Sequence, residues 1–253
     1  TKNVVELSIK KNFIKSLMLL YRAKSIVLHG FFYGWNHSLF WIANISLIKK
    51  STWVIWGSDL YLRLINLKKN ENRFSHGLMS LIVRSFRNIS CYIPGDYKLA
   101  KQTYKTKAKY IKTFYNNPVN WKLLDEMNGK KAQSSRVLFL VGNCADSASK
   151  HIEIFHKLSR YKEENIGVIS PLSYGDAEYG KTVANAGYSI FGQKFTPIFE
   201  LLSPEEYAKL LASIDVAVFN HDRQRALGNI ISLLYLRKKV YIKNDISLWR
   251  YFE

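Results

Sequence analysis

Two turns in the first half of the sequence hold side chains that can transfer protons. His29 ends an apolar run at residues 25–29, and Asp59 follows another at residues 52–56. If these runs are neighbouring parallel strands, both side chains lie at the same edge of a sheet. A histidine or a carboxylate there can act as a general base, or orient one, when its pKa is shifted towards neutral pH. The alternative is structural: His29 hydrogen-bonds the backbone and Asp59 caps the following helix.

The second half contains a turn at which a ligand can approach the backbone. Gly142 and Asn143 follow an apolar run at residues 136–141, and Asp146 and His151 come next. Glycine at a strand-to-helix turn leaves room for a ligand, and the N-terminus of the following helix favours an anion. By itself this pattern has low specificity.

A later turn carries groups that suit a diphosphate. Arg223 and Arg225 follow an apolar run at residues 216–219 and lead into an apolar helix at residues 225–235. Guanidinium groups and free amides at a helix N-terminus both bind phosphate oxygens. The alternative is that both arginines are solvated charges beside an ordinary helix start.

The sequence lacks the patterns of several nucleotide-dependent and metal-dependent proteins. It has no GxxxxGK[ST] and no GxGxxG, which argues against P-loop NTPases and Rossmann dehydrogenases. No Asp-x-Asp pair occurs, and the histidines of HIEIFH are not spaced as in HExxH, so we predict no catalytic metal. Two cysteines without a CxxC motif indicate neither a disulfide framework nor a thiolate zinc site, and they favour a reducing cytoplasm.

Strands alternating with helices must position these turns. Apolar runs of strand length alternate with segments of helical period along the whole chain, which is typical of α/β domains with parallel sheets. The predicted strands are residues 25–29, 52–56, 89–93, 136–141, 166–170, 188–191, 216–219 and 239–242. The predicted helices are residues 5–22, 35–48, 78–87, 95–104, 148–161, 177–186, 204–212 and 225–235, with a capping box at Ser203 and Glu206.

A polar segment at residues 116–135 divides this pattern in two. We therefore expect two Rossmann-like domains, residues 1–133 and 134–253, with a ligand cleft between the carboxyl edges of their sheets. The sequence starts at Thr1 and ends inside a predicted helix, so we expect a fragment that lacks elements at both ends.

Positive charge is concentrated in the first half. The whole chain has a net charge of +19, and residues 1–136 contain 24 Lys and Arg against 6 Asp and Glu. Such a bias indicates an anionic partner: nucleic acid, anionic lipid or a phosphorylated substrate. The predicted helix at residues 5–22 is basic and amphipathic, so it can lie on anionic lipid, although its apolar side is more often part of the core. The longest nearly uncharged apolar stretch, residues 38–48, is too short to cross a bilayer.

Five motifs in fixed order carry a resemblance to a known family. They are HGFF followed by W, IWGSDLY, VGNCADSASKH, PLSYGDAEY followed by AGYSIF, and EEYAKLLASIDVAVFNHDRQRALGN. In this order they resemble the bacterial glycosyltransferase family 56, the 4-alpha-L-fucosyltransferase family, from about residue 25 onward. The resemblance implies a GT-B fold and transfer of N-acetylfucosamine (4-acetamido-4,6-dideoxygalactose) from a TDP-sugar to lipid II in enterobacterial common antigen assembly.

The resemblance also assigns roles to the two domains. It implies that the first domain binds an undecaprenyl-diphosphate-linked saccharide acceptor and that the second binds the TDP-sugar donor. The protein would be peripheral, at an anionic membrane surface on the cytoplasmic side of the bacterial inner membrane, with no metal, no cofactor and no nucleic-acid partner. Basic residues near such a surface contribute about 1 kcal/mol each.

Carried over position by position, the resemblance gives three sets of site residues. The catalytic candidates are Asp59 and His29, and the acceptor-binding candidates are Gly30, Trp56, Gly57 and Tyr61. The donor-binding candidates are Gly142, Asn143, Asp146, Pro171, Tyr174, Tyr207, Arg223, Gln224, Gly228 and Asn229. Leu60 and His151 also match the family pattern, whereas Cys144, Ala145, Ser149 and Ala226 depart from it.

Two other functions stay open at this point. A related GT-B transferase could use another nucleotide sugar for capsule or O-antigen synthesis. A protein of another class could bind nucleic acid through the basic first half without catalysis, and its affinity would then fall steeply with salt. The nearly neutral second half, with its arginine-containing turn, argues against the nucleic-acid function.

Overall fold

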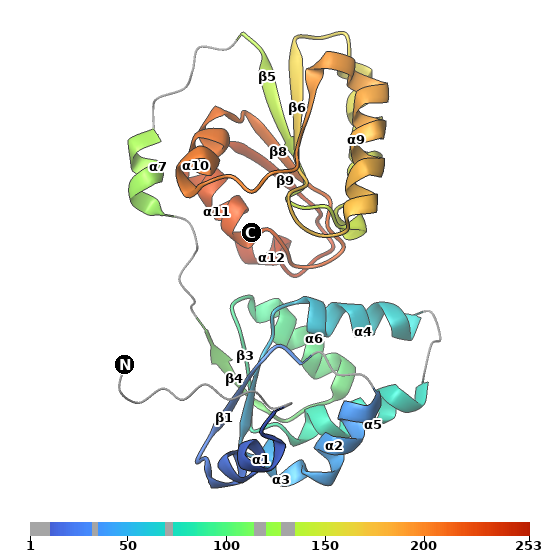
Figure 1. Cartoon of the computed structure of the whole chain (residues 1–253), viewed down its shortest axis with the longest axis vertical. Coiled ribbons are helices and arrows are strands. Elements are labelled where there is room, and N and C mark those ends of the chain that lie inside the picture. The colour runs from blue at the N-terminus through green and yellow to red at the C-terminus, as the bar shows by residue number, and fades with distance from the viewer. Residues whose placement is uncertain (1–10, 32–34, 69–72, 114–119, 128–134) are drawn as a thin grey trace. The chain divides into compact units, whose positions relative to one another are not determined.

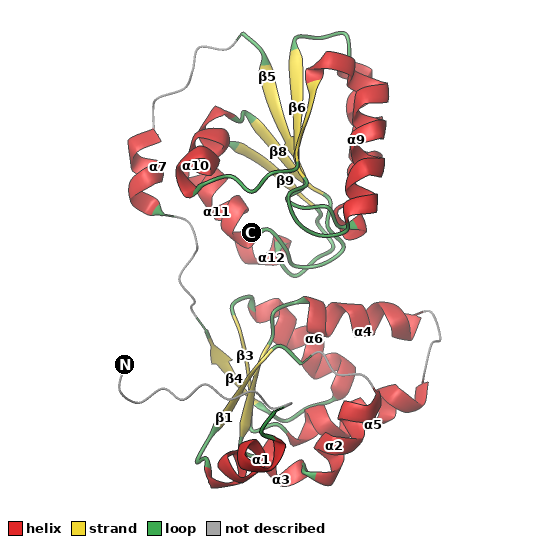
Figure 2. Cartoon of the chain, in the orientation of Figure 1, coloured by secondary structure: helices red, strands yellow, loops and turns green. Residues whose placement is uncertain are grey.

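The chain forms two compact α/β units. The computed structural model describes residues 11–31, 35–68, 73–113, 120–127 and 135–253. The units are Thr1–Tyr115 and Asn116–Glu253, and each contains one parallel sheet (Figures 1 and 2). This confirms the predicted fold class. Within the described ranges, no helix combines the length and the apolar character that crossing a bilayer requires.

The first unit has a four-stranded sheet whose strands follow one another in chain order. Neighbouring strands pair in parallel in the order β1-β2-β3-β4. Its strands are β1 (Ile26–His29), β2 (Ser51–Val54), β3 (Asn88–Cys91) and β4 (Lys109–Lys112). The helices described in it are α1 (Phe13–Arg22), α2 (Trp35–Ala43), α3 (Ile45–Ile48), α4 (Ser58–Lys68), α5 (Arg73–Ser85) and α6 (Pro94–Tyr104).

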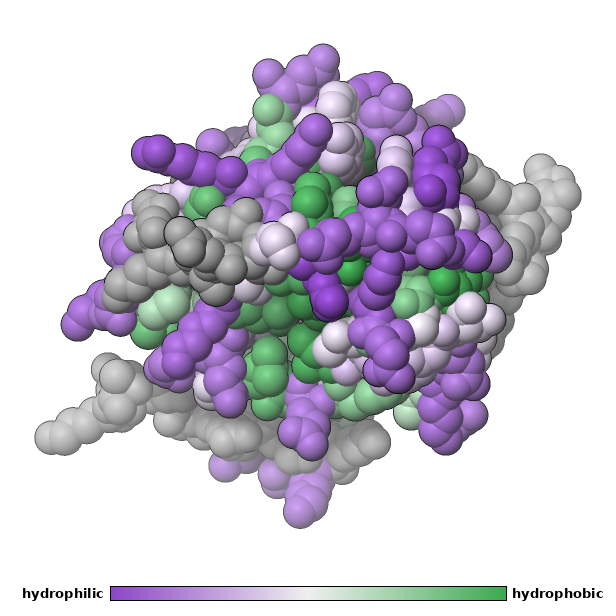
Figure 3. Space-filling view, turned by 90° about the horizontal axis from the view of Figure 1, so that it is seen from above, coloured by the Kyte–Doolittle hydropathy of each residue, from purple (hydrophilic) through white to green (hydrophobic). Residues whose placement is uncertain are grey.

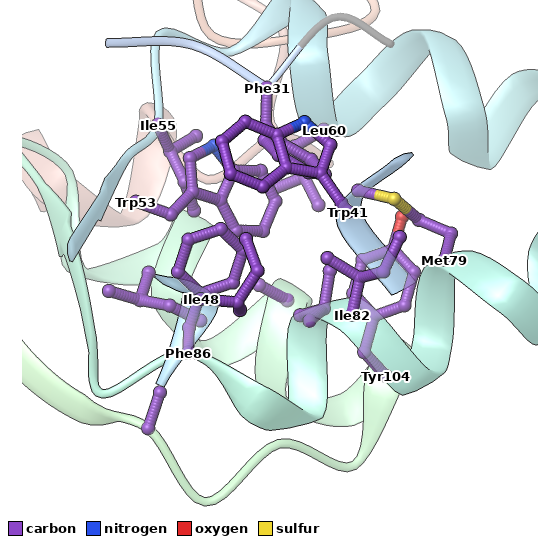
Figure 4. Close-up of a cluster of buried hydrophobic side chains, with 14 of the residues drawn as sticks. Phe31, Trp41, Ile48, Trp53, Ile55, Leu60, Met79, Ile82, Phe86 and Tyr104 are labelled. Carbon is purple, nitrogen blue, oxygen red and sulfur yellow. The ribbon is translucent and has the colours of Figure 1, made fainter. Parts of the chain in front are cut away.

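Aromatic side chains form the centre of the core in the first unit (Figure 4). Trp53 of β2 is fully buried, and its ring lies 6.2 Å from that of Phe31, just after β1. Phe31 also packs edge-on against Phe86, with ring centroids 5.4 Å apart. Trp41 of α2 and Tyr104 of α6 close this cluster, so the end of β1 is fixed by packing between sheet and helices.

The second unit has a five-stranded sheet in the order β7-β6-β5-β8-β9. Its strands are β5 (Val137–Val141), β6 (Ile166–Pro171), β7 (Phe195–Ile198), β8 (Val216–Phe219) and β9 (Lys239–Ile242). The helices described in it are α7 (Trp121–Met127), α8 (His151–Leu158), α9 (Ala177–Phe191), α10 (Pro204–Ser213), α11 (Leu227–Tyr235) and α12 (Trp249–Phe252). Short 3-10 turns are Ser147–Ser149, Ser159–Tyr161 and Gly192–Lys194.

Apolar side chains of the second unit are enclosed between its sheet and helices. Phe155 of α8 is fully buried and packs edge-on against Phe191 and Phe195. The predicted capping box is confirmed, because Ser203 accepts from the amide of Glu206 while Glu206 accepts from the amide of Ser203.

On the face seen in Figure 3, hydrophilic side chains form most of the surface and hydrophobic ones gather near its centre.

The structure corrects one predicted strand. Residues 188–191 belong to the last turn of α9 and not to a strand. The helix ends at Phe191, and the next residue, Gly192, has a φ of +56° and donates its amide to the carbonyl of Tyr188. The next strand is β7, which begins at Phe195. An apolar run of four residues fits either structure, and the glycine after it decides the outcome.

Other elements were missing from the sequence prediction. Helix α4 follows the turn that contains Asp59, and β4 is a lysine-rich edge strand without an apolar run. The predicted helix at residues 35–48 is divided into α2 and α3, and the one at residues 5–22 begins at Phe13 within the described residues.

The division between the units lies before α7. This helix falls in the segment that we predicted to be a connection, and the units divide at Tyr115 rather than after residue 133. Trp121 of α7 packs against Tyr235, with ring centroids 4.9 Å apart, and Asp125 accepts a hydrogen bond from the Tyr235 hydroxyl. These contacts join α7 to the second unit.

Candidate active site

The order of strands in the second sheet favours a candidate binding region at the ends of β5 and β8. These two strands are neighbours, yet the chain continues from β5 towards β6 and β7 on one side and from β8 towards β9 on the other. Open α/β sheets bind ligands beyond the carboxyl ends of strands at such a point. The loops that leave the two strands, residues 142–150 and 220–226, contain Asn143, Asp146, Arg223, Gln224 and Arg225.

Two arginines converge on one carboxylate between these loops. Asp146 Oδ2 lies 3.2 Å from Nη2 of Arg223 and 2.5 Å from Nη1 of Arg225. Nη2 of Arg225 also donates to Sγ of Cys144 over 3.1 Å. Since two guanidinium groups share one carboxylate, the cluster retains positive charge that an anionic ligand can neutralise.

The ion pair with Asp146 does not use all the N–H donors of Arg223. It is 5% exposed, and its Nε and Nη1 atoms have no hydrogen-bond partner among the described residues. A buried N–H group without a partner costs about 1–3 kcal/mol, more when it is charged. Burial lowers the pKa of Arg223, and Arg225 adds to that effect while Asp146 opposes it. The side chain is therefore poised to gain hydrogen bonds from a ligand that supplies oxygen atoms.

Asp146 has a second role as the cap of the turn after β5. Its Oδ1 accepts from the amide of Ala148 over 2.8 Å. Partial burial acts to raise the pKa of Asp146, but this amide and Arg225 outweigh it and hold the pKa below its usual range. The carboxylate therefore stays ionised at neutral pH and keeps the arginines in place.

Two buried histidines belong to the same region: His151 directly follows the first loop, and His221 lies in the second. His151 and His221 are 0% and 1% exposed, and their Nε2 atoms have no hydrogen-bond partner among the described residues. Burial lowers the pKa of His151 to about 4 and, with the help of Arg225, that of His221 to about 3. Both rings are thus neutral at physiological pH and add no charge to the cluster.

The start of α11 offers backbone donors to the same region. The residue before it, Ala226, has a φ of +56°, and its methyl side chain makes no capping hydrogen bond to the first turn of the helix. The amides of Gly228 and Asn229 therefore lie in the first turn, where backbone donors favour an anion. Asp222 fixes the loop by ion pairs of 2.9 Å to Lys150 and 2.7 Å to Lys243.

A pocket of about 270 Å³ lies beside this helix start, within the second unit. Asn143 donates to the hydroxyl of Tyr174 over 2.9 Å, and Tyr207 hydrogen-bonds Asn229. Burial raises the pKa of both tyrosines, so their hydroxyls stay protonated at neutral pH. The lining residues are Asn143, Pro171, Ser173, Tyr174, Ile198, Glu200, Leu201, Leu202, Pro204, Tyr207, Leu210 and Asn229. Five of the predicted donor-binding residues therefore share one pocket.

In the first unit, the structure places Asp59 in the core. It is 2% exposed, and its Oδ2 accepts from Nε1 of Trp53 over 2.7 Å and from the amide of Phe31 over 3.0 Å. Its Oδ1 accepts from the amide of Trp56 over 3.1 Å. Burial raises the pKa of Asp59, while these hydrogen bonds act to lower it. Both oxygens are used to join the ends of β1 and β2, which gives Asp59 the geometry of a positioning residue.

His29 lies at the same sheet edge but faces solvent. It is exposed at the end of β1, with its ring 6.1 Å from that of Trp56, which is 46% exposed. Register pairs His29 with Val54, so the ends of β1 and β2 adjoin as predicted. Of the two predicted catalytic residues, His29 is the one that a substrate can reach.

The remaining acceptor-binding candidates shape the turns or pack inward. Gly30 and Gly57 have φ angles of +73° and +97°, which L side chains rarely adopt, so both turns require glycine. Tyr61 is 8% exposed, and its hydroxyl donates to Asp96 over 2.7 Å. Only Trp56 of this set presents a large exposed surface.

Sequence reasoning omitted part of the site. The sequence prediction does not include Arg225 among the site residues, although Arg225 contacts Asp146 and Cys144. His221 was also overlooked, and so were Leu201 and Leu202 of the pocket. The signal in the sequence is that Arg225 follows Arg223 by two residues in the same turn, which indicates a second cation at the same place. Gln224 and Gly228, which were predicted, lie in the same turn and at the helix start, both partly buried.

Solved structures share this fold of two α/β units, each with a parallel sheet. Three of them are the UDP-forming α,α-trehalose-phosphate synthase from Burkholderia xenovorans (10% identity, TM-score 0.64), HepE from Anabaena in complex with UDP-glucose (10%, 0.61) and WaaG, a glycosyltransferase involved in lipopolysaccharide biosynthesis (12%, 0.58). Each match covers 95% of this chain and 64%, 65% and 65% of the respective structure, so the chain spans about two thirds of their length. The fold is that of GT-B glycosyltransferases.

Within that class the family is defined by the sequence. The chain belongs to the family described as 4-alpha-L-fucosyltransferase, glycosyl transferase group 56, whose family model matches residues 6–252. This confirms the resemblance found in the five motifs.

Proposed function

We propose that this chain transfers 4-acetamido-4,6-dideoxygalactose from a TDP-sugar to an undecaprenyl-diphosphate-linked saccharide. It would act as a peripheral protein on the cytoplasmic side of the bacterial inner membrane. Membership of group 56 supports a glycosyl transfer activity. The single observation that carries the proposal is the buried Arg223, whose Nε and Nη1 have no hydrogen-bond partner in the described part of the chain and which lies four residues before the start of α11.

The donor diphosphate would bind between Arg223 and the first turn of α11. As the bond from the anomeric carbon to the diphosphate oxygen breaks, its electron pair leaves with the nucleoside diphosphate. The guanidinium and the amides of Gly228 and Asn229 would stabilise that charge, because preorganised donors are most effective where charge develops. Gly142, Asp146 and Gln224 would shape this subsite, with Asp146 holding the arginines.

The nucleoside would occupy the neighbouring pocket. Its lining combines an apolar floor with the amides of Asn143 and Asn229 and the hydroxyls of Tyr174 and Tyr207. Small-molecule sites generally have this composition, in which a few polar groups fix the orientation of the ligand. Pro171 at the end of β6 would form part of the apolar wall.

On the acceptor side we propose His29 as the base. The acceptor hydroxyl oxygen forms the new bond to the anomeric carbon, and its proton passes to His29. Trp56 would contact the acceptor sugar, while Asp59, Gly30, Gly57 and Tyr61 would hold the two turns in place. Asp59 is thereby proposed as a positioning residue and not as the base.

Calorimetric titration of the full chain with dTDP, UDP and GDP tests the proposal. We expect saturable binding that tolerates added salt and favours dTDP. A short single-stranded oligonucleotide is titrated in parallel at two salt concentrations. Tight oligonucleotide binding without preference for any diphosphate would overturn the proposal in favour of nucleic-acid binding. A transfer assay with several TDP-sugars then distinguishes the proposed donor from those of capsule or O-antigen synthesis.

A further inference from the structure

The described surface of the first unit has no exposed carboxylate. Between residues 11 and 113, the acidic side chains within the described ranges are Asp59 and Asp96, which are 2% and 3% exposed. Asp59 accepts three hydrogen bonds, and Asp96 accepts one from Tyr61. Neither can neutralise the surface lysines and arginines of this unit, so its described surface attracts anions.

Helix α1, whose place in the first unit is labelled in Figure 1, combines this charge with exposed apolar side chains. Ile14 and Met18, one turn apart, are 72% and 50% exposed. The residue that the helix buries is Ser16, at 7% exposure. An amphipathic helix that serves only the core turns its apolar side inward, and α1 leaves part of that side in solvent.

Basic residues lie next to this apolar stripe. At 100° per residue, Lys15 and Arg22 fall on the same outward side as Ile14 and Met18, and both are exposed. There is no acidic residue in the first turn of α1. Apolar side chains bordered by cations are the pattern of helices that lie in the interface of an anionic membrane.

The opposite side of α1 is fixed to the unit. Leu17 and Leu20 pack against the core cluster. Nζ of Lys50 donates to the backbone carbonyls of Tyr21 and Ala23, each over 2.7 Å, at the end of the helix. Because the helix is held in this way, rotation that would bury Ile14 and Met18 would break these contacts.

We propose that α1 docks the first unit onto an anionic lipid surface. Ile14 and Met18 enter the headgroup region, while Lys15 and Arg22 contact lipid phosphates. A nucleic acid would satisfy the cations but would leave the aliphatic side chains in water, so a lipid surface fits both features. The inference rests on the proposed function in that a membrane-borne acceptor requires such a contact, but it can be tested separately.

Co-sedimentation of the full chain with phospholipid vesicles measures the docking. Vesicles of phosphatidylcholine alone are compared with vesicles that contain about 30% phosphatidylglycerol, an anionic lipid. We expect binding to the anionic vesicles that weakens with salt, and weak binding to the neutral ones. Equal binding to both would overturn the proposal.

Paired variants separate the apolar and basic contributions. Ile14→Gln with Met18→Gln is expected to weaken vesicle binding roughly tenfold, and Lys15→Gln with Arg22→Gln by about fivefold per charge. The matched controls lie in the second unit and outside the proposed donor pocket: Leu234→Gln, at a residue 44% exposed, and Lys181→Gln, at an exposed lysine. Losses in the controls as large as those in α1 would overturn the proposal. The proposal would also be overturned if an oligonucleotide competed with vesicles for the chain and its binding were unchanged by Ile14→Gln.

An introduced thiol gives a direct readout. Both native cysteines are buried, so a polarity-sensitive fluorophore attached to Ile14→Cys labels one accessible position. Its emission is expected to shift to the blue with anionic vesicles only, and the absence of a shift would contradict insertion. Calorimetric titration of the α1 variants with dTDP distinguishes membrane docking from the proposed donor binding. These variants are expected to bind dTDP as the unchanged protein does.

Discussion

The imidazole of His151 fills the space beside Gly142 in which any side chain would stand. A Cβ atom built on Gly142 would lie 2.2 Å from Nε2 of His151, well inside contact distance. Gly142 also has a φ of +70°, so the end of β5 needs glycine both for its backbone conformation and for the close approach of the ring. Two residues nine positions apart therefore fix the base of the loop that contains Asp146.

Replacing this glycine is expected to destabilise the second unit. For Gly142→Ala we predict a loss of about 2–4 kcal/mol in the free energy of unfolding, from backbone strain and from displacement of a buried ring. Gly192→Ala is a control for a positive φ without a steric clash, because its φ is +56° but nothing lies within 4 Å of the added Cβ. Urea unfolding of both variants measures the difference. Equal losses would show that the contact with His151 contributes nothing.

Arg223→Ala is expected to weaken dTDP binding without unfolding the chain. Arg225 and Asp146 still form an ion pair in this variant, so neither charge is left buried without a partner and the second unit is expected to stay folded. Loss of charge-assisted hydrogen bonds predicts a roughly 10- to 100-fold increase in Kd. Arg160→Ala, at an exposed arginine of the same unit, serves as the control in the calorimetric titration. Unchanged affinity in Arg223→Ala would refute the diphosphate role.

The buried histidines predict loss of stability in mild acid. The pKa values of His151 and His221 are about 4 and about 3, below the ordinary 6.5, so the unfolded chain takes up protons first. Their contribution to stability is complete above pH 6.5 and falls as the pH drops towards these values, by about 1.4 kcal/mol per pH unit for each histidine. Urea unfolding between pH 7.5 and pH 5, as rough limits around that window, measures the slope.

Replacing one histidine separates its contribution to the pH dependence of the unfolding free energy from the contribution of titrating carboxylates. His221→Gln is expected to reduce the slope, because one of the two groups no longer titrates. His156→Gln, at an exposed histidine of α8, controls for the replacement of an imidazole. An unaltered slope in His221→Gln would contradict the assignment of the acid sensitivity to this buried pair.

Replacement of Asp59 is expected to lower stability, whereas replacement of His29 is expected to lower the rate of sugar transfer. Asp59→Asn loses the charge that accepts three hydrogen bonds, so we predict a loss of about 3 kcal/mol in the free energy of unfolding. His29→Gln alters an exposed side chain and should leave unfolding unchanged while abolishing most sugar transfer. Thermal unfolding and the transfer assay together test both statements. Full transfer by folded His29→Gln would exclude His29 as the base.

Hydrophobic pattern and turn chemistry predicted most of the sheets. The continuous apolar run at residues 136–141 predicted the strand β5, and Ser203 with Glu206 predicted the start of α10. The pattern was insufficient at residues 188–191, where a short apolar run fits a strand and a helix equally. It also missed β4, since an edge strand rich in lysine lacks an apolar run.

The sequence by itself determined the class of fold, the family and the turns that hold the candidate site. Those properties depend on local periodicity, on residue types and on the order of motifs. Only the tertiary structure decided that Asp146 meets both arginines, because that contact joins residues about 80 positions apart through the pairing of β5 with β8. It likewise decided that Asp59 faces the core and His29 faces solvent, since burial depends on packing against Trp53 and Phe31 and not on the order of residues in a turn.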